Sequence, residues 1–567
     1  MISRADQQGS AKPLRPPKQV MRLARLGSLH QCRLSFMRIL TRQLAQDHWS
    51  FVRHAFAIDD QGVGHAVYTA KGPERSYSLV AFAHDLPPEM RSDRVIATAW
   101  DATFTLFDGV PEQADIARLA QNVPVQEAGR ISEQEFSLSR ANRSVRLWEH
   151  VVERLAQGLQ PDTELLAQVG YLMRTTAVYG SGKFGAADYA TISGRPEFNA
   201  PFQAEMLSVY LIRWFVRDLA NHMARARGGD QAVPLDPDIA RTLGIGNSTG
   251  LGLGPFIINH PKLFNNWLLA RETAIARVRS IQCANPDEVA TFRKFLGYAS
   301  QSIGLWRSEH PVQLDKLASL KRDVHRLIEH TAGAVLEQAY PWDQLIIWSE
   351  RSLNTEGQEL LASLILEPYG ELVDDLAKTM SDPVPSDLII NGSMLIAEVK
   401  SLLEQNFDWA FDMDWAIQAN CARAWYVSAE KLEPRLGERF EEPLEPYEQP
   451  LAPARDAAAA YHALTDWDET KPVAEFLLRH PEHRHTIRRA QISANAPYAE
   501  IRDNTIGEDL FPVDLLRAKL AFFGATQFDP RSDRWLRICM FGGAPYPEEL
   551  TRENADFWVY PPCTTAR

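Results

Sequence analysis

Residues 48–83 read HWSFVRHAFAIDDQGVGHAVYTAKGPERSYSLVAFA, and this stretch decides the fold expected for the N-terminal region. Its apolar runs, 48–58, 65–70 and 77–83, are separated by short connections rich in Asp, Gly and Pro. Runs of this length with turn residues between them are typical of antiparallel strands. A further run follows at 95–107. The pattern therefore predicts a β-meander, which needs a helical layer on one face to bury its apolar side chains.

The pattern becomes helical from about residue 115 to residue 380. Apolar side chains recur at spacings of three and four residues over 148–159, 268–278 and 317–328, as on the buried face of a helix. We therefore predict an α+β fold that is predominantly helical. It has an N-terminal antiparallel β-meander, a central helical region and a C-terminal mixed α/β region. In the last region we expect strands at 486–503 and 535–541 and a helix at 510–523.

The composition divides the chain into a series of predicted segments. Residues 1–27 are strongly basic and are expected to form a disordered tail. Residues 430–453 are rich in Glu and Pro, the composition of a surface loop or linker. The predicted domains are a β-rich domain at 28–113, a helical domain with glycine-rich loops at 114–380, and an α+β domain at 381–567.

Charge and cysteine content narrow the possible partners. The formal net charge of −13 argues against a nucleic-acid partner, because such proteins usually carry a basic surface. The five cysteines lie far apart without a Cys-x-x-Cys motif, which argues against a disulfide framework or zinc site. An apolar run of about 18 residues and a secretory leader are both missing. We therefore expect a soluble, cytoplasmic protein that binds no membrane, and a homo-oligomer stays open.

Two glycine-rich segments, YGSGKFG at 179–185 and GIGNSTGLGLG at 244–254, are the strongest indication of a ligand site. Glycine lets backbone amides approach an anion closely, and a following helix N-terminus adds partial positive charge. The alternative is that these glycines only allow tight packing. The sequence at 180–183 departs from a phosphate-binding P-loop, and the Gly-x-Ser-x-Gly match at 246–250 lacks the strand and helix that a serine hydrolase needs.

Residues in and near these segments are assigned to the predicted site. Lys183 is interpreted as a charged contact or base, and His260 and Glu205 as groups that move a proton. Each has a structural alternative: a solvated loop lysine, a hydrogen-bonded histidine in a first turn, and a glutamate complementing a helix N-terminus. The predicted substrate-binding residues are Tyr179, Ser181, Arg195, Asn247, Ser248 and Thr249.

No metal is predicted at this site, and the sequence indicates no cofactor. The histidines at 480, 483 and 485 match no zinc motif, and neighbouring arginines would repel a cation. We therefore predict an enzyme that acts on a small anionic substrate by metal-independent acid/base chemistry, with a lyase or transferase favoured over a hydrolase. The alternatives are a non-catalytic helical assembly or regulatory protein that binds a macromolecular partner, and a nucleotide-dependent ligase.

Overall fold

The computed structural model describes most of the 567 residues. These are residues 11–87, 100–121, 123, 132–176, 192, 194–249, 260–306, 308, 311–381, 389–417, 420, 423–425, 448–450, 453–502, 509–510, 516–529, 536–556 and 558.

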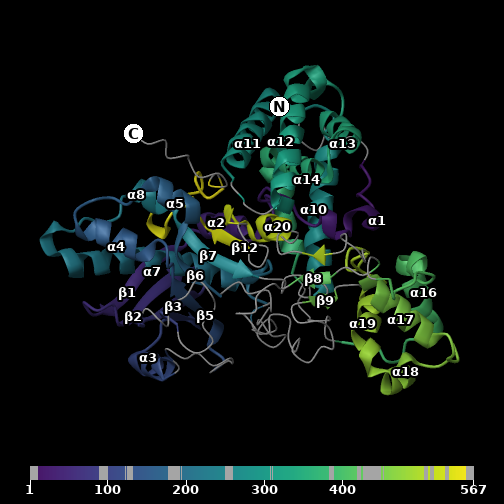
Figure 1. Ribbon diagram of the computed structural model, residues 1–567, viewed down its shortest axis with the longest axis horizontal. Coiled ribbons are helices and arrows are strands. Elements are labelled where there is room, and N and C mark those ends of the chain that lie inside the picture. The colour runs from purple at the N-terminus through teal and green to yellow at the C-terminus, as the bar shows by residue number, and fades with distance from the viewer. Residues whose placement is uncertain are drawn as a thin grey trace.

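A nine-stranded sheet organises the larger part of the described chain (Figure 1). Every pair of neighbouring strands is antiparallel except β6 and β7, which run parallel. The strands, in spatial order, are β1 Ser50–Ile58, β2 Gly64–Lys71, β3 Ser76–Ala83, β4 Ala102–Asp108, β5 Glu135–Arg143, β6 Tyr171–Thr175, β7 Gly244–Thr249, β12 Leu536–Met540 and β11 Gln527–Asp529.

The predicted β-meander is confirmed as strands β1 to β4. The first turn forms because the Asp59 carboxylate accepts hydrogen bonds from the backbone amides of Gln61 and Val63. Gly62 in this turn has φ of +81°, a conformation that favours glycine. The order of helices and strands also confirms the predicted α+β, predominantly helical fold. The sheet extends beyond the meander.

The long helix α7, Gln203–Gly228, covers one face of the sheet. Its Trp214 ring lies 4.9 Å from the Tyr68 ring, and its Phe215 ring lies 5.6 Å from the Phe104 ring. Arg213 is buried in this helix, and its guanidinium donates to three backbone carbonyls, which satisfies the charge without a carboxylate. The smaller helix α3, Gln113–Ala120, packs against apolar side chains on the other face.

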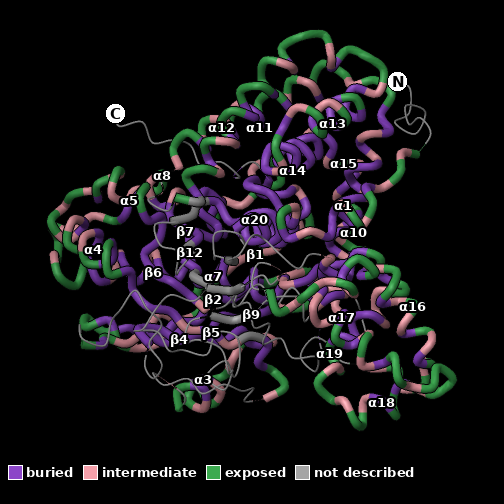
Figure 2. Tube along the Cα trace, turned by 45° about the vertical axis from the view of Figure 1, so that its right-hand side comes forward, coloured by how far each residue is buried: buried purple, intermediate pink, exposed green. Residues whose placement is uncertain are grey.

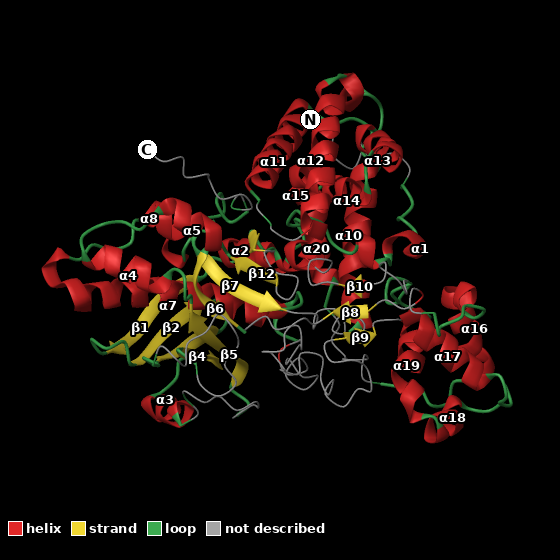
Figure 3. Cartoon of the chain, in the orientation of Figure 1, coloured by secondary structure: helices red, strands yellow, loops and turns green. Residues whose placement is uncertain are grey.

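The predicted central helices form a layer beside the sheet (Figure 3). Helix α11 begins at a capping box between Asn285 and Glu288, and several of these helices begin with proline in the first turn. The helices of this layer are α10 Pro261–Arg279, α11 Pro286–Leu305, α12 Pro311–Ala332, α13 Pro341–Ser352, α14 Thr355–Leu364 and α15 Gly370–Val373. The short helix α1 Pro17–Val20 lies beside α10 (Figure 1). Further helices near the sheet are α2 Phe36–Gln46, α4 Trp148–Ala156, α5 Thr163–Val169, α8 Pro237–Thr242 and α20 Leu516–Ala518, which continues as a π-helix at Lys519–Phe523.

A second, smaller core lies apart from the sheet, among four helices in the lower right of Figure 1. These helices are α16 Ile396–Phe407, α17 Pro453–Leu464, α18 Val473–Arg479 and α19 Arg484–Ser493. The strand predicted at 486–503 is wrong for residues 486–493, because Ile487 and Ala490 are buried on one face of α19. A small three-stranded sheet contains β8 Arg423–Trp425, β9 Glu448–Pro450 and β10 Asp509–Leu510.

Two sequence expectations change with this architecture. Residues 11–27 are not a disordered tail, because Arg15 is buried and donates to the carboxylates of Glu272 and Glu359. The sheet also crosses the boundary predicted at residues 113 and 114, because β5, β6 and β7 continue the sheet that β1 to β4 begin. None of the helices in the described part of the chain combines the length and apolarity that crossing a membrane requires.

Candidate functional site

The parallel strands β6 and β7 end at the same edge of the sheet, and each leads along the chain toward one of the glycine-rich segments. Tyr171 pairs with Gly244 and Arg174 with Gly246, so both strands end at the same side. The chain runs from the end of β6 toward residues 179–185 and from the end of β7 toward residues 250–254, all of which lie outside the described residues. In open sheets, ligands bind beyond the carboxyl ends of parallel strands. This edge is therefore the candidate site (Figure 3).

The first glycines of the second segment are packing residues within a strand. Residues 244–249, predicted as part of a loop, form β7 instead. A Cβ atom at Gly246 would lie 2.6 Å from the Tyr171 ring, and one at Gly244 would lie 2.2 Å from the Met540 carbonyl oxygen. Ser248 lies in the ladder opposite Arg537 and not at a sharp turn, so the strand-to-turn geometry of a serine nucleophile is missing there.

Lys519, which the sequence analysis does not single out, contacts β7 close to its carboxyl end. It is 1% exposed, and its Nζ donates a hydrogen bond of 2.5 Å to Asn247 Oδ1. The Asn247 amide in turn donates to the Thr175 carbonyl oxygen at 3.2 Å, at the end of β6. Within the described residues Lys519 forms no ion pair. Burial therefore lowers the pKa of Lys519 to about 7.

The local sequence places this lysine in the core. Lys519 opens the π-helix Lys519–Phe523, which ends at Gly524 with φ of +92°. The Phe523 ring packs 5.9 Å from Phe36 and 5.2 Å from Phe202, which immediately precedes α7. These aromatic contacts anchor the segment, so the lysine is buried by its neighbours. π-helical turns inside longer helices occur frequently at functional sites.

The opposite face of the same strands carries a second polar group. Arg174 on β6 is paired in register with Asn142 on β5, and both side chains are buried. Among the described residues, neither side-chain amide atom of Asn142 has a hydrogen-bond partner. Arg140, two residues before Asn142, lies over the Trp100 ring at 4.5 Å. A buried polar group that the described residues leave without a partner calls for an explanation such as a ligand.

The structure brings together only part of the predicted site. Asn247 lies at the centre of the candidate site, and the backbones of Ser248 and Thr249 belong to the same strand, although their side chains are not described. Glu205 is buried in the first turn of α7, just after Phe202. The predicted residues Tyr179, Ser181 and Lys183 lie outside the described residues.

Arg195 and His260 have other surroundings. Arg195 donates two hydrogen bonds to the Asp108 carboxylate, at 3.1 and 2.8 Å, and one of 3.1 Å to the Tyr77 hydroxyl. His260 is the N-cap residue of α10. Burial, together with the positive charge of Arg488, lowers the pKa of His260 to about 4, so its ring is neutral at pH 7 and a weak base.

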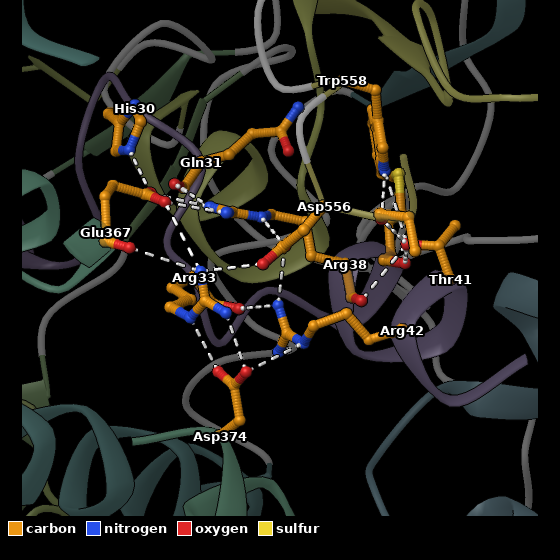
Figure 4. Close-up of polar contacts among 12 residues, drawn as sticks. His30, Gln31, Arg33, Arg38, Thr41, Arg42, Glu367, Asp374, Asp556 and Trp558 are labelled. Carbon is orange, nitrogen blue, oxygen red and sulfur yellow. Dashed lines mark hydrogen bonds and ion pairs between the residues drawn. The ribbon is translucent and has the colours of Figure 1, made fainter. Parts of the chain in front are cut away.

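A buried charge cluster elsewhere in the core provides a contrast with Lys519 (Figure 4). Arg38 donates to both oxygens of Glu367, at 2.7 and 2.8 Å, and to Asp556 at 3.0 Å. His30 contacts the same glutamate at 2.9 Å. Burial alone would raise the pKa of Glu367, but Arg38 and His30 lower it to about 2. Every charge here has an opposite charge beside it, which is typical of a structural network.

Comparison with protein-family models, curated proteins and solved structures finds no match to this chain.

Proposed function

We propose that the protein is a cytoplasmic enzyme that acts on a small anionic substrate at the carboxyl ends of β6 and β7, with Lys519 as its acid/base group. One observation carries the proposal: a buried lysine without an ion pair among the described residues contacts Asn247, where two parallel strands lead into the two glycine-rich segments. Isolating a cation in this way costs folding free energy, so a functional reason for it is favoured.

The chemistry follows from the environment of the lysine. An amine is most effective in proton transfer when its pKa lies near the working pH, and burial brings Lys519 to about 7. In the proposed reaction, neutral Lys519 Nζ takes a proton from the substrate. The resulting ammonium then gives that proton to the departing group, so the lysine is regenerated. This cycle needs no metal ion and suits a lyase or a transferase.

The anionic character of the substrate is carried over from the sequence prediction, and two arginines lie close to the same strand ends. Arg174 and Arg140 lie on the opposite face of β6 and β5 from Asn247, close to the strand ends. Guanidinium groups bind carboxylates and phosphates through paired hydrogen bonds. Lys183 and the glycine-rich backbone stay predicted contacts of the same anion. With a pKa of about 4, His260 is a weaker candidate base than Lys519.

The test is a ligand screen of the full chain by thermal denaturation. The probes are inorganic phosphate, pyrophosphate, ATP, succinate and acetyl-CoA, applied to the wild type and to Lys519→Met. Methionine keeps the length of the side chain and removes its charge. A probe that binds the native state at a hundred times its Kd adds about 2.7 kcal/mol of stability. We expect one class of anion to raise the wild-type Tm, and the shift to shrink in Lys519→Met.

A second stage measures turnover of the compound class that the screen selects. Lys519→Met should reduce kcat by about 10²- to 10⁴-fold, the usual contribution of a positioned acid/base group. Lys471→Met is the matched control, because Lys471 is half exposed and pairs with Glu475 at 3.5 Å on the surface. An unchanged Tm with every probe, or equal shifts in wild type and Lys519→Met, would count against the proposed site.

A further inference from the structure

A cluster of three potential metal ligands lies at the surface beside the second core, between α18 and α19. Glu482 Oε1 is 3.2 Å from His480 Nδ1 and 3.9 Å from His483 Nε2, and one ligand atom from each residue lies within 4.8 Å of the others. Zinc binds nitrogen and oxygen at about 2.0–2.2 Å, so the donors of a tetrahedral site are about 3.3–3.5 Å apart. The separations of 3.2 and 3.9 Å lie on either side of this spacing, so small side-chain rotations bring the three atoms to the positions that one ion requires.

The local sequence holds the two imidazole rings in place. Pro481 begins a single 3₁₀ turn, Pro481–His483, which brings His480 and His483 to the same side. Both rings lie nearly parallel to the Phe476 ring, with centroids 4.9 and 5.7 Å from it. The Trp467 ring meets the His480 ring edge-on at 6.1 Å. A ligand set that is already ordered loses little conformational entropy on binding.

Three of the four arginines that flank this cluster in the sequence contact other groups. The Arg479 guanidinium lies over the Trp467 ring at 5.1 Å. The Arg484 side chain donates to His485 Nε2 at 3.3 Å, and Arg489 lies 3.5 Å from the Glu500 carboxylate. The fourth, Arg488, is buried, and its charge acts on His485. The structure therefore weakens the sequence argument against a metal, because three of the guanidinium groups are directed to partners outside the cluster.

We propose that His480 Nδ1, Glu482 Oε1 and His483 Nε2 bind one divalent transition-metal ion of the zinc class. Two imidazoles and one carboxylate are a ligand set that zinc uses in proteins, with a water molecule in the fourth position. Glu482 is 60% exposed and His480 38% exposed, so an ion reaches the site from solvent (Figure 2 shows α18 at the rim of the molecule). The site lies in a different core from Lys519 and does not depend on the function proposed above.

The experiment titrates the EDTA-treated and dialysed full chain with zinc chloride by calorimetry, and with cobalt chloride by visible absorption. We expect one zinc per chain and a cobalt spectrum typical of four ligands. His483→Ala and Glu482→Gln should each weaken zinc binding at least about 10- to 100-fold, the cost of changing even an outer partner of a metal ligand.

His325→Ala is the matched control, because His325 is an exposed histidine on α12 and lies outside the three-ligand cluster. This variant should bind zinc like the wild type. Glu482→Gln alters a largely exposed side chain, so a folding defect should not obscure its result. Zinc binding that is undetectable in the wild type, or that falls equally in His325→Ala and His483→Ala, would overturn the proposal.

Discussion

Two regions of the core treat a buried charge in opposite ways. Around Arg38, the charges of Glu367 and Asp556 lie within 3.0 Å, and the network extends to Arg33, Arg42 and Asp374 (Figure 4). Around Lys519, the contact is the neutral amide of Asn247. The side chains of Arg38, Glu367 and Lys519 are all buried, so the extent of burial does not explain the difference between the two regions.

The difference is visible in the ionisation of the two regions. Paired carboxylates have lowered pKa values, about 2 for Glu367, because the neighbouring guanidinium stabilises the charged form. The pKa of Lys519 falls to about 7 because the described residues place no anion beside its buried ammonium. A network that satisfies its own charges contributes to the fold, and so does a buried guanidinium such as Arg213, which donates to three carbonyls. Lys519 has neither arrangement among the described residues, which makes it a candidate for contact with a ligand.

Breaking the paired network should give the largest effect on stability. Glu367→Gln keeps the shape of the side chain but leaves Arg38 with less negative charge in a site excluded from water. We expect a loss of about 3–5 kcal/mol in the free energy of unfolding, as for other broken buried ion pairs. Urea denaturation at pH 7 measures the loss. The exposed Glu337 supplies the control Glu337→Gln, which should change stability by less than about 0.5 kcal/mol.

The same variant should also flatten the acid limb of the stability profile. The folded-state pKa of Glu367 is about 2, below its unfolded value, so the pair stabilises the fold above about pH 4.5 and loses this contribution as the pH falls toward 2. Glu367→Gln has no such titration. If wild type and variant lose stability in parallel between pH 4.5 and 2, Glu367 is not the charged partner that the geometry indicates.

Lys519 should also make stability rise with pH, but on the alkaline side of neutrality and not in acid. Its folded-state pKa of about 7 lies below the unfolded value of about 10.4, so between these pH values the unfolded chain binds more protons. Stability should therefore rise with pH, by about 2 kcal/mol from pH 7 to 9. Lys519→Met should remove this rise and be the more stable protein at pH 7.

The measurement is the difference in unfolding free energy between wild type and Lys519→Met at several pH values from 7 to 9, because other titrating groups cancel in this difference. Lys471→Met, at an exposed position, should show no such slope relative to wild type. A flat difference for Lys519→Met would mean that the amine is charged at neutral pH and has an anionic partner, which would contradict the contrast between the two regions.

A structural feature can be predicted from sequence when the residues that cause it lie close together in the chain. The strands β1 to β4 follow from apolar runs and from a turn that Asp59 and Gly62 form within a few residues. The burial of Arg15 depends on Glu272 and Glu359, which are more than 250 residues away in the chain. Composition alone therefore made residues 11–27 resemble a disordered tail.

The candidate site shows the same limit. Glycine at 244 and 246 indicated close approach, but the sequence did not show that the close neighbours are Met540 and Tyr171 of the same sheet. Lys519 lies in an apolar run, where a lysine usually extends its amine to solvent. Its burial depends on Phe36 and Phe202, which pack around the segment from distant parts of the chain. The only indication of this burial in the sequence is the apolar character of the neighbouring residues.

Breaking an exposed ion pair should have the smallest effect on the free energy of unfolding. Arg277 donates to Asp375 at 2.8 Å, but their side chains are 34% and 61% exposed. Water and salt already stabilise both charges there, so Asp375→Asn should cost about 0–1 kcal/mol, and less at high ionic strength. Thermal denaturation at low and high salt measures this. A loss as large as that of Glu367→Gln would show that pairing geometry, and not exclusion from water, sets the strength of these networks.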